Sequence, residues 1–174
     1  WAAADSALAE ARSLERADWP PRLRERFALH VASVGSYRGD AQAYKTALRH
    51  LIEVAESAGF DASAMIGRNR LADAALLAGD VEEAIVSGER AVALARQLDM
   101  SQAIGSALAN LCAALLVAGR TDAARGAAAQ ALPLLQEHDY YGGLLNSHLA
   151  LLAAQCERWA DAGALLGAAD RWYL

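Results

Sequence analysis

An internal repeat constrains this chain more than any other feature. Gly39, Gly79 and Gly119 are spaced 40 residues apart. Other columns keep the same spacing: Val31, Leu71 and Leu111; Ala32, Ala72 and Cys112; Tyr44, Ala84 and Ala124; Leu51, Ala91 and Ala131; Phe60, Met100 and Tyr140. A fixed period of this size is typical of solenoids, in which no single unit can bury its own apolar surface and each one stacks on the next.

Each unit is expected to be a pair of antiparallel helices, here called A and B. Alanine, the strongest helix former, makes up about a quarter of the chain. Apolar residues recur at the i, i+3/i+4, i+7 spacing of a buried helix face, as in Ala84, Gly88, Ala91 and Ala95. A lone B helix is predicted over 2–17, followed by the pairs 21–38 with 41–58, 62–78 with 81–98, 102–118 with 122–137, and 141–156 with 160–172. The predicted fold class is therefore all-α, a single solenoid domain of about nine antiparallel helices.

These helices make a half repeat over 1–18 and four full repeats over about 21–58, 61–98, 101–137 and 140–173. Asp80 and Glu83 are spaced as a capping box, and Asp40, Asp61, Ser101 and Thr121 are expected to be N-caps. The repeated glycines suit the left-handed conformation that ends a helix. Pro133 falls inside a predicted B helix, so we expect a kink or break near Ala129.

The stretch from Leu71-Ala72 through Gly79-Asp80 to Ala84 and Ala91 resembles the tetratricopeptide repeat, and so does the stretch from Leu111-Cys112 through Gly119-Arg120 to Ala124 and Ala131. That signature has a small residue after a leucine in helix A, a Gly-Asp or Gly-Arg turn, and two small residues in helix B. The chain departs from it in lacking the early aromatic of helix A and the closing proline, and in its longer period, since the usual one is about 34 residues.

The longer period resembles a subset of these repeats, the C-terminal sensor regions of bacterial signal-transduction ATPases fused to DNA-binding domains. The closing run ALLGAAD, residues 164–170, is similar to the ends of such regions. The resemblance implies a right-handed superhelix whose concave face is lined by A helices. It also implies binding of a partner protein, a peptide or a small inducer, or packing against another domain of the parent chain. A stand-alone adaptor or chaperone-like scaffold is the alternative.

No enzyme signature accompanies the repeats, because the sequence has no phosphate-binding glycine loop, no HExxH and no GxSxG. His148 and Cys156 are the one pair considered for a metal, and two ligands do not make a zinc site. Cys112 occupies a small-residue column and is expected to pack in the core. The sequence therefore predicts neither catalysis nor a cofactor or metal, and a helical enzyme domain is a remote alternative.

The candidate binding residues are the positions of the A helices that, by the resemblance, face away from the B partners. Arg and Asn among them suit a peptide backbone or a carboxylate, since Arg offers a planar fork of donors and Asn both donates and accepts. The alternative is that they are solvated, or that Asn110 bonds within the scaffold. The predicted positions are Arg26, Ser33, Tyr37, Asn69, Arg70, Asp73, Ser106, Asn110, Asn146 and Ser147, with apolar neighbours at Leu29, Ala113 and Leu151.

Charge and composition limit the classes of partner and the cellular compartment that the sequence favours. The formal net charge of −5 does not favour nucleic acid or an anionic membrane. Arg22, Arg24 and Arg26 are interpreted as a solvated helix face offset by nearby acids. Only two cysteines and no signal peptide predict a cytoplasmic protein. Because the chain has no initiator methionine and begins and ends on a B helix, it is expected to be a fragment that self-associates.

Overall fold

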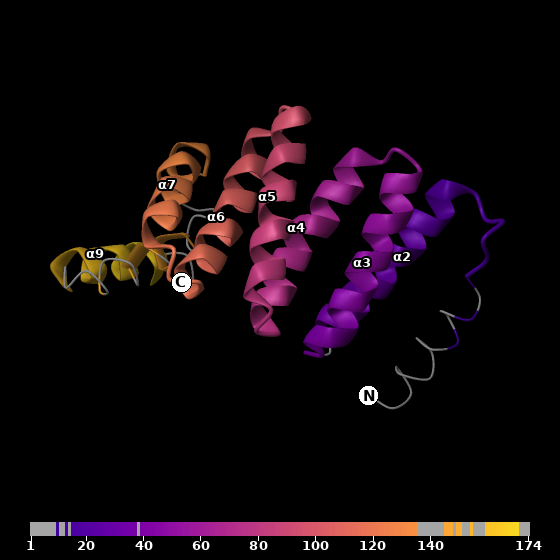
Figure 1. Ribbon diagram of the computed structural model, residues 1–174, viewed down its shortest axis with the longest axis horizontal. Coiled ribbons are helices and arrows are strands. Elements are labelled where there is room, and N and C mark those ends of the chain that lie inside the picture. Colours follow the sequence, from indigo (N-terminus) through magenta and orange to yellow (C-terminus); the bar gives the residue numbers. More distant parts are fainter. Residues whose placement is uncertain are drawn as a thin grey trace.

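A computed structural model describes residues 10, 13, 15–37, 39–135, 145–147, 149, 150, 154 and 159–170. Within these residues the secondary structure is helical, without a strand. The helices are α2 (Pro21–Tyr37), α3 (Ala41–Ser57), α4 (Asp61–Leu77), α5 (Val81–Gln97), α6 (Ser101–Val117), α7 (Thr121–Ala131), the 3-10 helix η1 (Leu132–Leu134) and α9 (Trp159–Asp170). Three successive hairpins, α2–α3, α4–α5 and α6–α7, reproduce the predicted A and B pairs (Figure 1).

From α2 to α7 each helix packs on the next one along the chain, so the three hairpins stack in sequence order (Figure 1). Helix α4 also contacts α6 directly, so these two A helices meet on one side of the stack. We call the surface formed by α2, α4 and α6 the A-helix face, and that formed by α3, α5 and α7 the B-helix face. In the described part of the chain, no helix is long and apolar enough to cross a membrane.

The repeated glycines end helices in the predicted way. Gly79 has φ of +83°, its N–H donates to the carbonyl of Leu76 at 3.0 Å, and the N–H of Asp80 donates to that of Ala75 at 2.8 Å. These two bonds are the Schellman pattern, which needs a left-handed residue after the helix. Gly39, Gly59 and Gly119 have φ between +68° and +71°, and Asp99 takes the corresponding conformation at φ of 54°.

Three of the predicted N-caps need correction. Asp40 does cap α3, because its Oδ1 accepts from the N–H of Ala43 at 2.9 Å. Asp61, Ser101 and Thr121 are the first helical residues rather than caps. The residue that closes the preceding Schellman turn is already the N-cap of the next helix, so the cap falls on Phe60, Met100 and Arg120.

Asp80 occupies the N-cap of α5, but its carboxylate makes no capping bond. It pairs instead with Lys45 of α3, whose side chain is 2% exposed. Lys45 Nζ also stands 2.9 Å from Glu83, which Arg49 contacts at 2.6 Å. Burial alone would raise the pKa of Glu83, but hydrogen bonds from Lys45 and Arg49 and their charges hold that pKa below its ordinary value. This ion network ties α3 to the first turn of α5.

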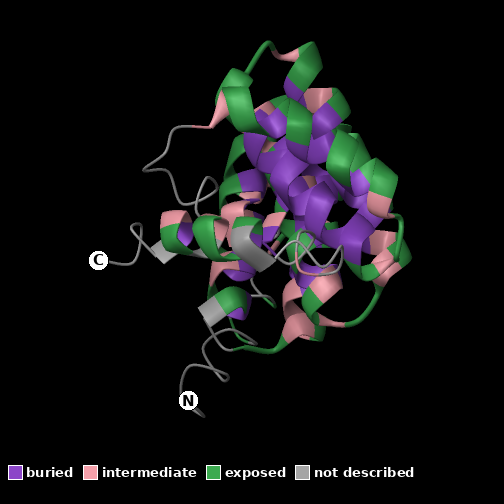
Figure 2. Ribbon diagram, turned by 90° about the vertical axis from the view of Figure 1, so that its left-hand side faces the viewer, coloured by how far each residue is buried: buried purple, intermediate pink, exposed green. Residues whose placement is uncertain are grey.

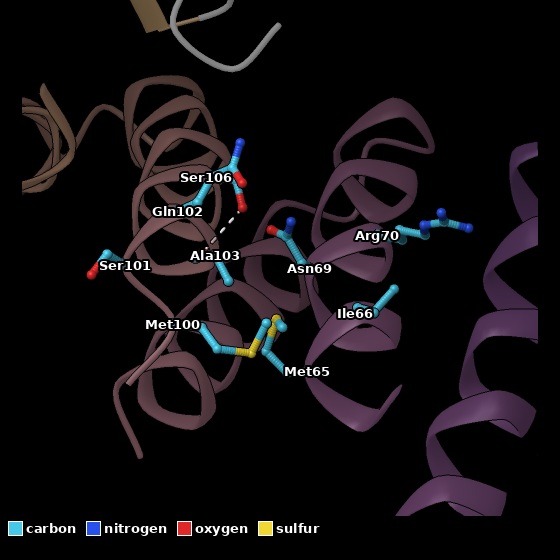
Figure 3. A pocket seen from close by; sticks show the side chains of 9 residues that line it. All are labelled: Met65, Ile66, Asn69, Arg70, Met100, Ser101, Gln102, Ala103 and Ser106. Atoms are coloured by element: carbon cyan, nitrogen blue, oxygen red, sulfur yellow. Dashed lines mark hydrogen bonds between the residues drawn. The ribbon is translucent and has the colours of Figure 1, made fainter. Parts of the chain in front are cut away.

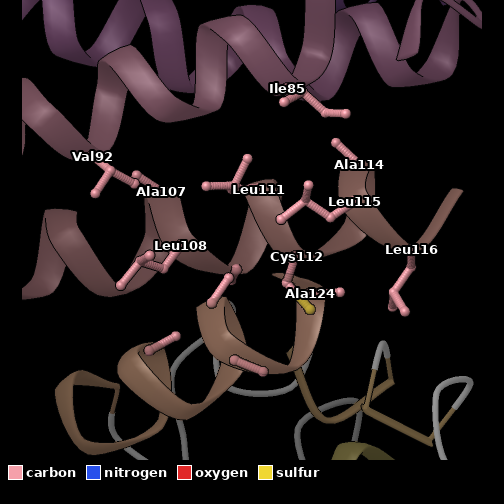
Figure 4. Packing of buried hydrophobic residues seen from close by; sticks show 14 of the residues in the cluster. Ile85, Val92, Ala107, Leu108, Leu111, Cys112, Ala114, Leu115, Leu116 and Ala124 are labelled. Carbon is pink, nitrogen blue, oxygen red and sulfur yellow. The ribbon is translucent and has the colours of Figure 1, made fainter. Parts of the chain in front are cut away.

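The core is built largely from small residues that let the helices approach closely. Figure 2 shows that the buried residues gather at the centre of the stack. A Cβ at Gly88 would stand 3.3 Å from Cβ of Leu111, and one at Gly67 would stand 2.8 Å from Cγ1 of Ile52. Leu111 and Cys112 of α6 lie at the centre of the larger cluster (Figure 4). Leu77, the last residue of α4, lies outside this core and is 74% exposed.

Both ends of the described stack differ from the predicted helices. Residues 15–20 form a turn, so the helix predicted over 2–17 does not reach Ala17. Helix α7 ends at Ala131, and Pro133 lies within η1. Proline has no N–H to donate, so the break predicted near Ala129 falls after Ala131. Of the pair predicted over 141–156 and 160–172, the described residues are helical and include α9; the rest lies outside the description.

Candidate functional site

A cavity on the A-helix face lies between α4 and α6 and has a volume of about 560 Å³. Figure 3 shows the side chains that surround it. It brings together three of the predicted site residues, Asn69, Arg70 and Ser106. Its other lining residues are Met65, Ile66, Met100, Ser101, Gln102 and Ala103.

One wall of this cavity is apolar and was not predicted from the sequence. Met65 lies at its base and is 3% exposed, while Ile66 and Met100 are 39% and 41% exposed. Figure 3 shows Met65 and Met100 directed toward each other across the space between the two helices. The signal that points to Met100 is the column of bulky residues at Phe60, Met100 and Tyr140, which the repeat alignment contains. Methionine adapts its shape to the group it meets, so this wall suits an apolar side chain.

Asn69 and Asn110 are held together across the neighbouring A helices. Nδ2 of Asn110 donates to Oδ1 of Asn69 at 3.0 Å, and both residues are buried. Asn110 does not line the cavity, so it acts within the scaffold by fixing the amide of Asn69. Among the described residues, no side chain accepts a hydrogen bond from Nδ2 of Asn69, which leaves this donor for a ligand.

Three further polar residues lie beside the apolar wall. Ser106 is buried, and its hydroxyl donates to the carbonyl of Ala103 at 3.0 Å. Ser101 and Gln102 begin α6 and are exposed at the edge of the cavity. The cavity therefore combines an apolar interior with hydrogen-bonding groups along one side.

Arg70 and Asp73 lie further along α4, and both are exposed. Arg70 extends away from the two methionines (Figure 3) and hydrogen bonds with Tyr44 of α3. Burial raises the pKa of the Tyr44 hydroxyl. The positive charge of Arg70 and hydrogen bonds with Ser36 and Arg70 lower that pKa, whereas the negative charge of Asp73 raises it further. Nearby protein atoms also remove part of the hydration of Asp73, and this desolvation raises the pKa of its carboxyl.

The remaining predicted positions that the structure describes do not line the cavity. Arg26 is exposed on α2, and the hydroxyl of Ser33 donates to the carbonyl of Leu29 at 2.9 Å. Tyr37 ends α2, and its side chain lies outside the described atoms, as does Leu151. Asn146 and Ser147 are half-buried beside Leu145, which packs in the core. Whether any of these positions meets a ligand stays a prediction.

The basic residues at the start of α2 have local partners. Arg22 stacks 3.8 Å above the ring of Phe60, and Arg24 stands 3.7 Å from Glu15. Glu15 also contacts His50 at 2.9 Å. Residues engaged in this way are held by their own neighbours, which favours the interpretation as an ordinary helix face over a docking patch.

The surroundings of Cys112 disfavour the reactive thiolate form of its side chain. Cys112 is buried in the core, as expected, and burial raises the pKa of its thiol to about 11. Where the structure is described, no group of three or more His, Cys, Asp or Glu side chains is placed to hold a metal ion. His148 and Cys156 lie outside the described residues.

No family model and no curated protein matches the chain. Solved structures match over nearly all of its length. BtubC (BKLC) from P. vanneervenii superposes with a TM-score of 0.75 at 17% identity, covering 97% of this chain and 70% of its own. The nearly identical TPR-like repeats of a Podosopora anserina kinesin light chain give 0.70 at 18% identity, covering 97% and 83%.

The apo form of RapI is a third similar structure, with a TM-score of 0.78 at 12% identity. The match covers 92% of this chain and 45% of RapI. At identities this low, the superpositions support a shared fold and nothing about function. The chain therefore has a TPR-like helical-repeat fold, as its glycine and alanine columns predict.

Proposed function

We propose that this chain is a non-enzymatic interaction domain that binds a segment of a partner protein on its A-helix face. The observation that supports this most is the cavity of about 560 Å³ between α4 and α6. Its volume falls in the range of about 300–1,000 Å³ that is common for ligand sites. An apolar wall beside a few fixed hydrogen-bonding groups is the composition expected of a site that holds one side chain and the backbone next to it.

The expected ligand follows from the lining. An apolar side chain would enter between Met65, Ile66 and Met100 and remove their apolar surface from water. Nδ2 of Asn69 would donate to a backbone carbonyl of the same segment. Arg70, the residue after Asn69 in α4, would meet a carboxylate of the ligand.

A narrower part of the proposal is that the chain forms a right-handed superhelix and serves as the cytoplasmic sensor region of a bacterial transcriptional regulator. Its support is the 40-residue period and the resemblance described above. Sequencing the gene beyond these 174 residues tests it. A phosphate-binding loop or a helix-turn-helix in the same reading frame is expected, and a gene without either would favour an adaptor instead.

Binding is tested by selecting peptides from a displayed random library against the 174-residue chain and measuring the affinity of the selected sequences by calorimetry. Met100→Glu places a charge in the apolar wall and should weaken binding at least about tenfold, which is 1.4 kcal/mol. Val86→Glu is the matched control, because Val86 is 49% exposed on the B-helix face. Selected peptides that bind both variants equally well, or a library that yields no binder, would count against the site.

A further inference from the structure

A second groove lies on the B-helix face, between α5 and α7, with a volume of about 340 Å³. Its floor consists of Leu108, Leu111 and Leu115 of α6, the middle helix in Figure 4. Its walls are Glu89, Val92 and Arg96 on one side and Ala123, Gly126, Ala127 and Gln130 on the other. Apart from Gln130, the side chains of α7 that line the groove are small, and the three leucines beneath are between 2% and 8% exposed.

The preceding pair of B helices, α3 and α5, provides a comparison within the same molecule. At the 40-residue period, Arg49 corresponds to Glu89, and Glu83 corresponds to Ala123. Arg49 and Glu83 bridge the interval between α3 and α5 at 2.6 Å. In the later interval a glutamate faces an alanine, so the same bridge cannot form. The α3–α5 interval is therefore bridged at a level where the α5–α7 interval is not.

The groove is bridged near both ends but carries a free carboxylate between them. Arg120 pairs with Glu82 at 2.7 Å near the start of the two helices, and Arg96 donates to Gln130 at 2.7 Å near their ends. Glu89 has no partner among the residues that the structure describes. An apolar floor with one carboxylate at its edge suits a side chain with an aliphatic stem and a cationic head, which describes Arg or Lys.

Helix α5 itself presents such a side chain at a matching position. Glu89, Ala93 and Arg96 are exposed at i, i+4, i+7 spacing, so they follow one stripe of the helix. If two copies of α5 cross antiparallel at Ala93, Arg96 of each copy falls opposite Glu89 of the other. A closed two-fold dimer requires this reciprocal complementarity.

We propose that this surface binds a second copy of the chain as an antiparallel two-fold dimer. The aliphatic stem of Arg96 from each copy covers the leucine floor of the other copy. Its guanidinium leaves the amide of Gln130 in its own copy and binds the carboxylate of Glu89 in the other, which is a stronger acceptor. The same two-fold axis lays α7 over α7 of the second copy. The exposed residues of α7 at that level include Ala123, Gly126 and Ala129, which let two helices approach closely.

Gly126 supports the same arrangement independently. Glycine is unfavourable inside a helix, and a Cβ added at Gly126 would meet no atom of the described residues within 4 Å. Packing against the described residues therefore does not require glycine here. The open position leaves room for a second helix to lie against α7.

Sedimentation equilibrium of the whole 174-residue chain over a wide concentration range tests the proposal. The wild type should dimerise reversibly. Glu89→Arg and Arg96→Glu should each lower the association constant at least about tenfold, because each creates two like-charge pairs in the dimer. The double variant Glu89→Arg/Arg96→Glu should restore association, because the pairs re-form with their signs exchanged. Glu53→Arg, an equal charge change at an exposed site of α3, should have no effect.

Gly126→Leu should abolish association while the circular dichroism spectrum and melting temperature of the monomer are maintained. A wild type that stays monomeric throughout, or a double variant that associates no better than its two single variants, would overturn the proposal. So would a Glu89→Arg chain that dimerises as strongly as the wild type. None of these outcomes bears on peptide binding at the A-helix face, which involves different residues.

Discussion

The buried amide pair between α4 and α6 allows a quantitative prediction. Asn110→Ala removes the donor that stands 3.0 Å from Oδ1 of Asn69, and Asn69 is only 7% exposed. A buried polar group left without its partner costs about 1–3 kcal/mol, more than the net contribution of the bond itself. We therefore expect Asn110→Ala to lower the free energy of unfolding by about 2 kcal/mol.

The double variant separates the pair from its surroundings. Asn69→Ala should cost a similar amount, but Asn69→Ala/Asn110→Ala removes both partners together and leaves neither amide unpaired. Its cost should fall short of the sum of the single costs by about 1 kcal/mol or more, within the range of coupling between contacting residues. Urea unfolding followed by circular dichroism measures all four proteins. Strictly additive costs, or single costs below about 0.5 kcal/mol, would refute the amide pair.

Three other outcomes follow from burial and charge. Leu111→Ala should lower the free energy of unfolding by about 2–5 kcal/mol because it opens a cavity in the core. Leu77 is 74% exposed, so Leu77→Ala should change that free energy by less than about 0.5 kcal/mol. Equal effects of the two substitutions in urea unfolding would contradict the packing. Cys112, with a thiol pKa of about 11, should react with iodoacetamide at pH 8 only as fast as the chain opens, and rapid alkylation of the folded protein would show that it is accessible. Because the pKa of Glu83 is lowered on folding, its contribution is full above the ordinary value of 4.5 and fades as the pH falls through the folded value. The stability advantage of the wild type over Glu83→Gln should therefore shrink on acidification, and a pH-independent difference would count against the network with Lys45.

The repeat architecture could be predicted from the sequence because its causes are local. Glycine at 39, 79 and 119 marks left-handed turns that a residue with a side chain rarely adopts, and the structure has positive φ at all three. Likewise, Ala84, Gly88, Ala91 and Ala95 are buried where α5 packs closely on its neighbours. Such positions depend on one unit and its nearest contacts, so the period identifies them.

Features that depend on contacts between units could not be read in the same way. Asp80 looked like a capping residue, but a lysine 35 positions earlier takes its carboxylate. Met65 and Met100 form one wall of the cavity only because α4 and α6 stand side by side. The bond between Asn69 and Asn110 also joins neighbouring units, so the sequence nominated both residues without showing that they pair.

The central claim, that the cavity between α4 and α6 receives a peptide side chain, is tested most directly by NMR. A library-selected peptide is titrated into the ¹⁵N-labelled chain, and the amide shifts are mapped onto the helices. The largest shifts should cluster at Ile66, Arg70, Met100 and Gln102, and Met100→Glu should remove them together with the binding. Shifts centred on α3 and α5, with those four amides unmoved, would contradict it.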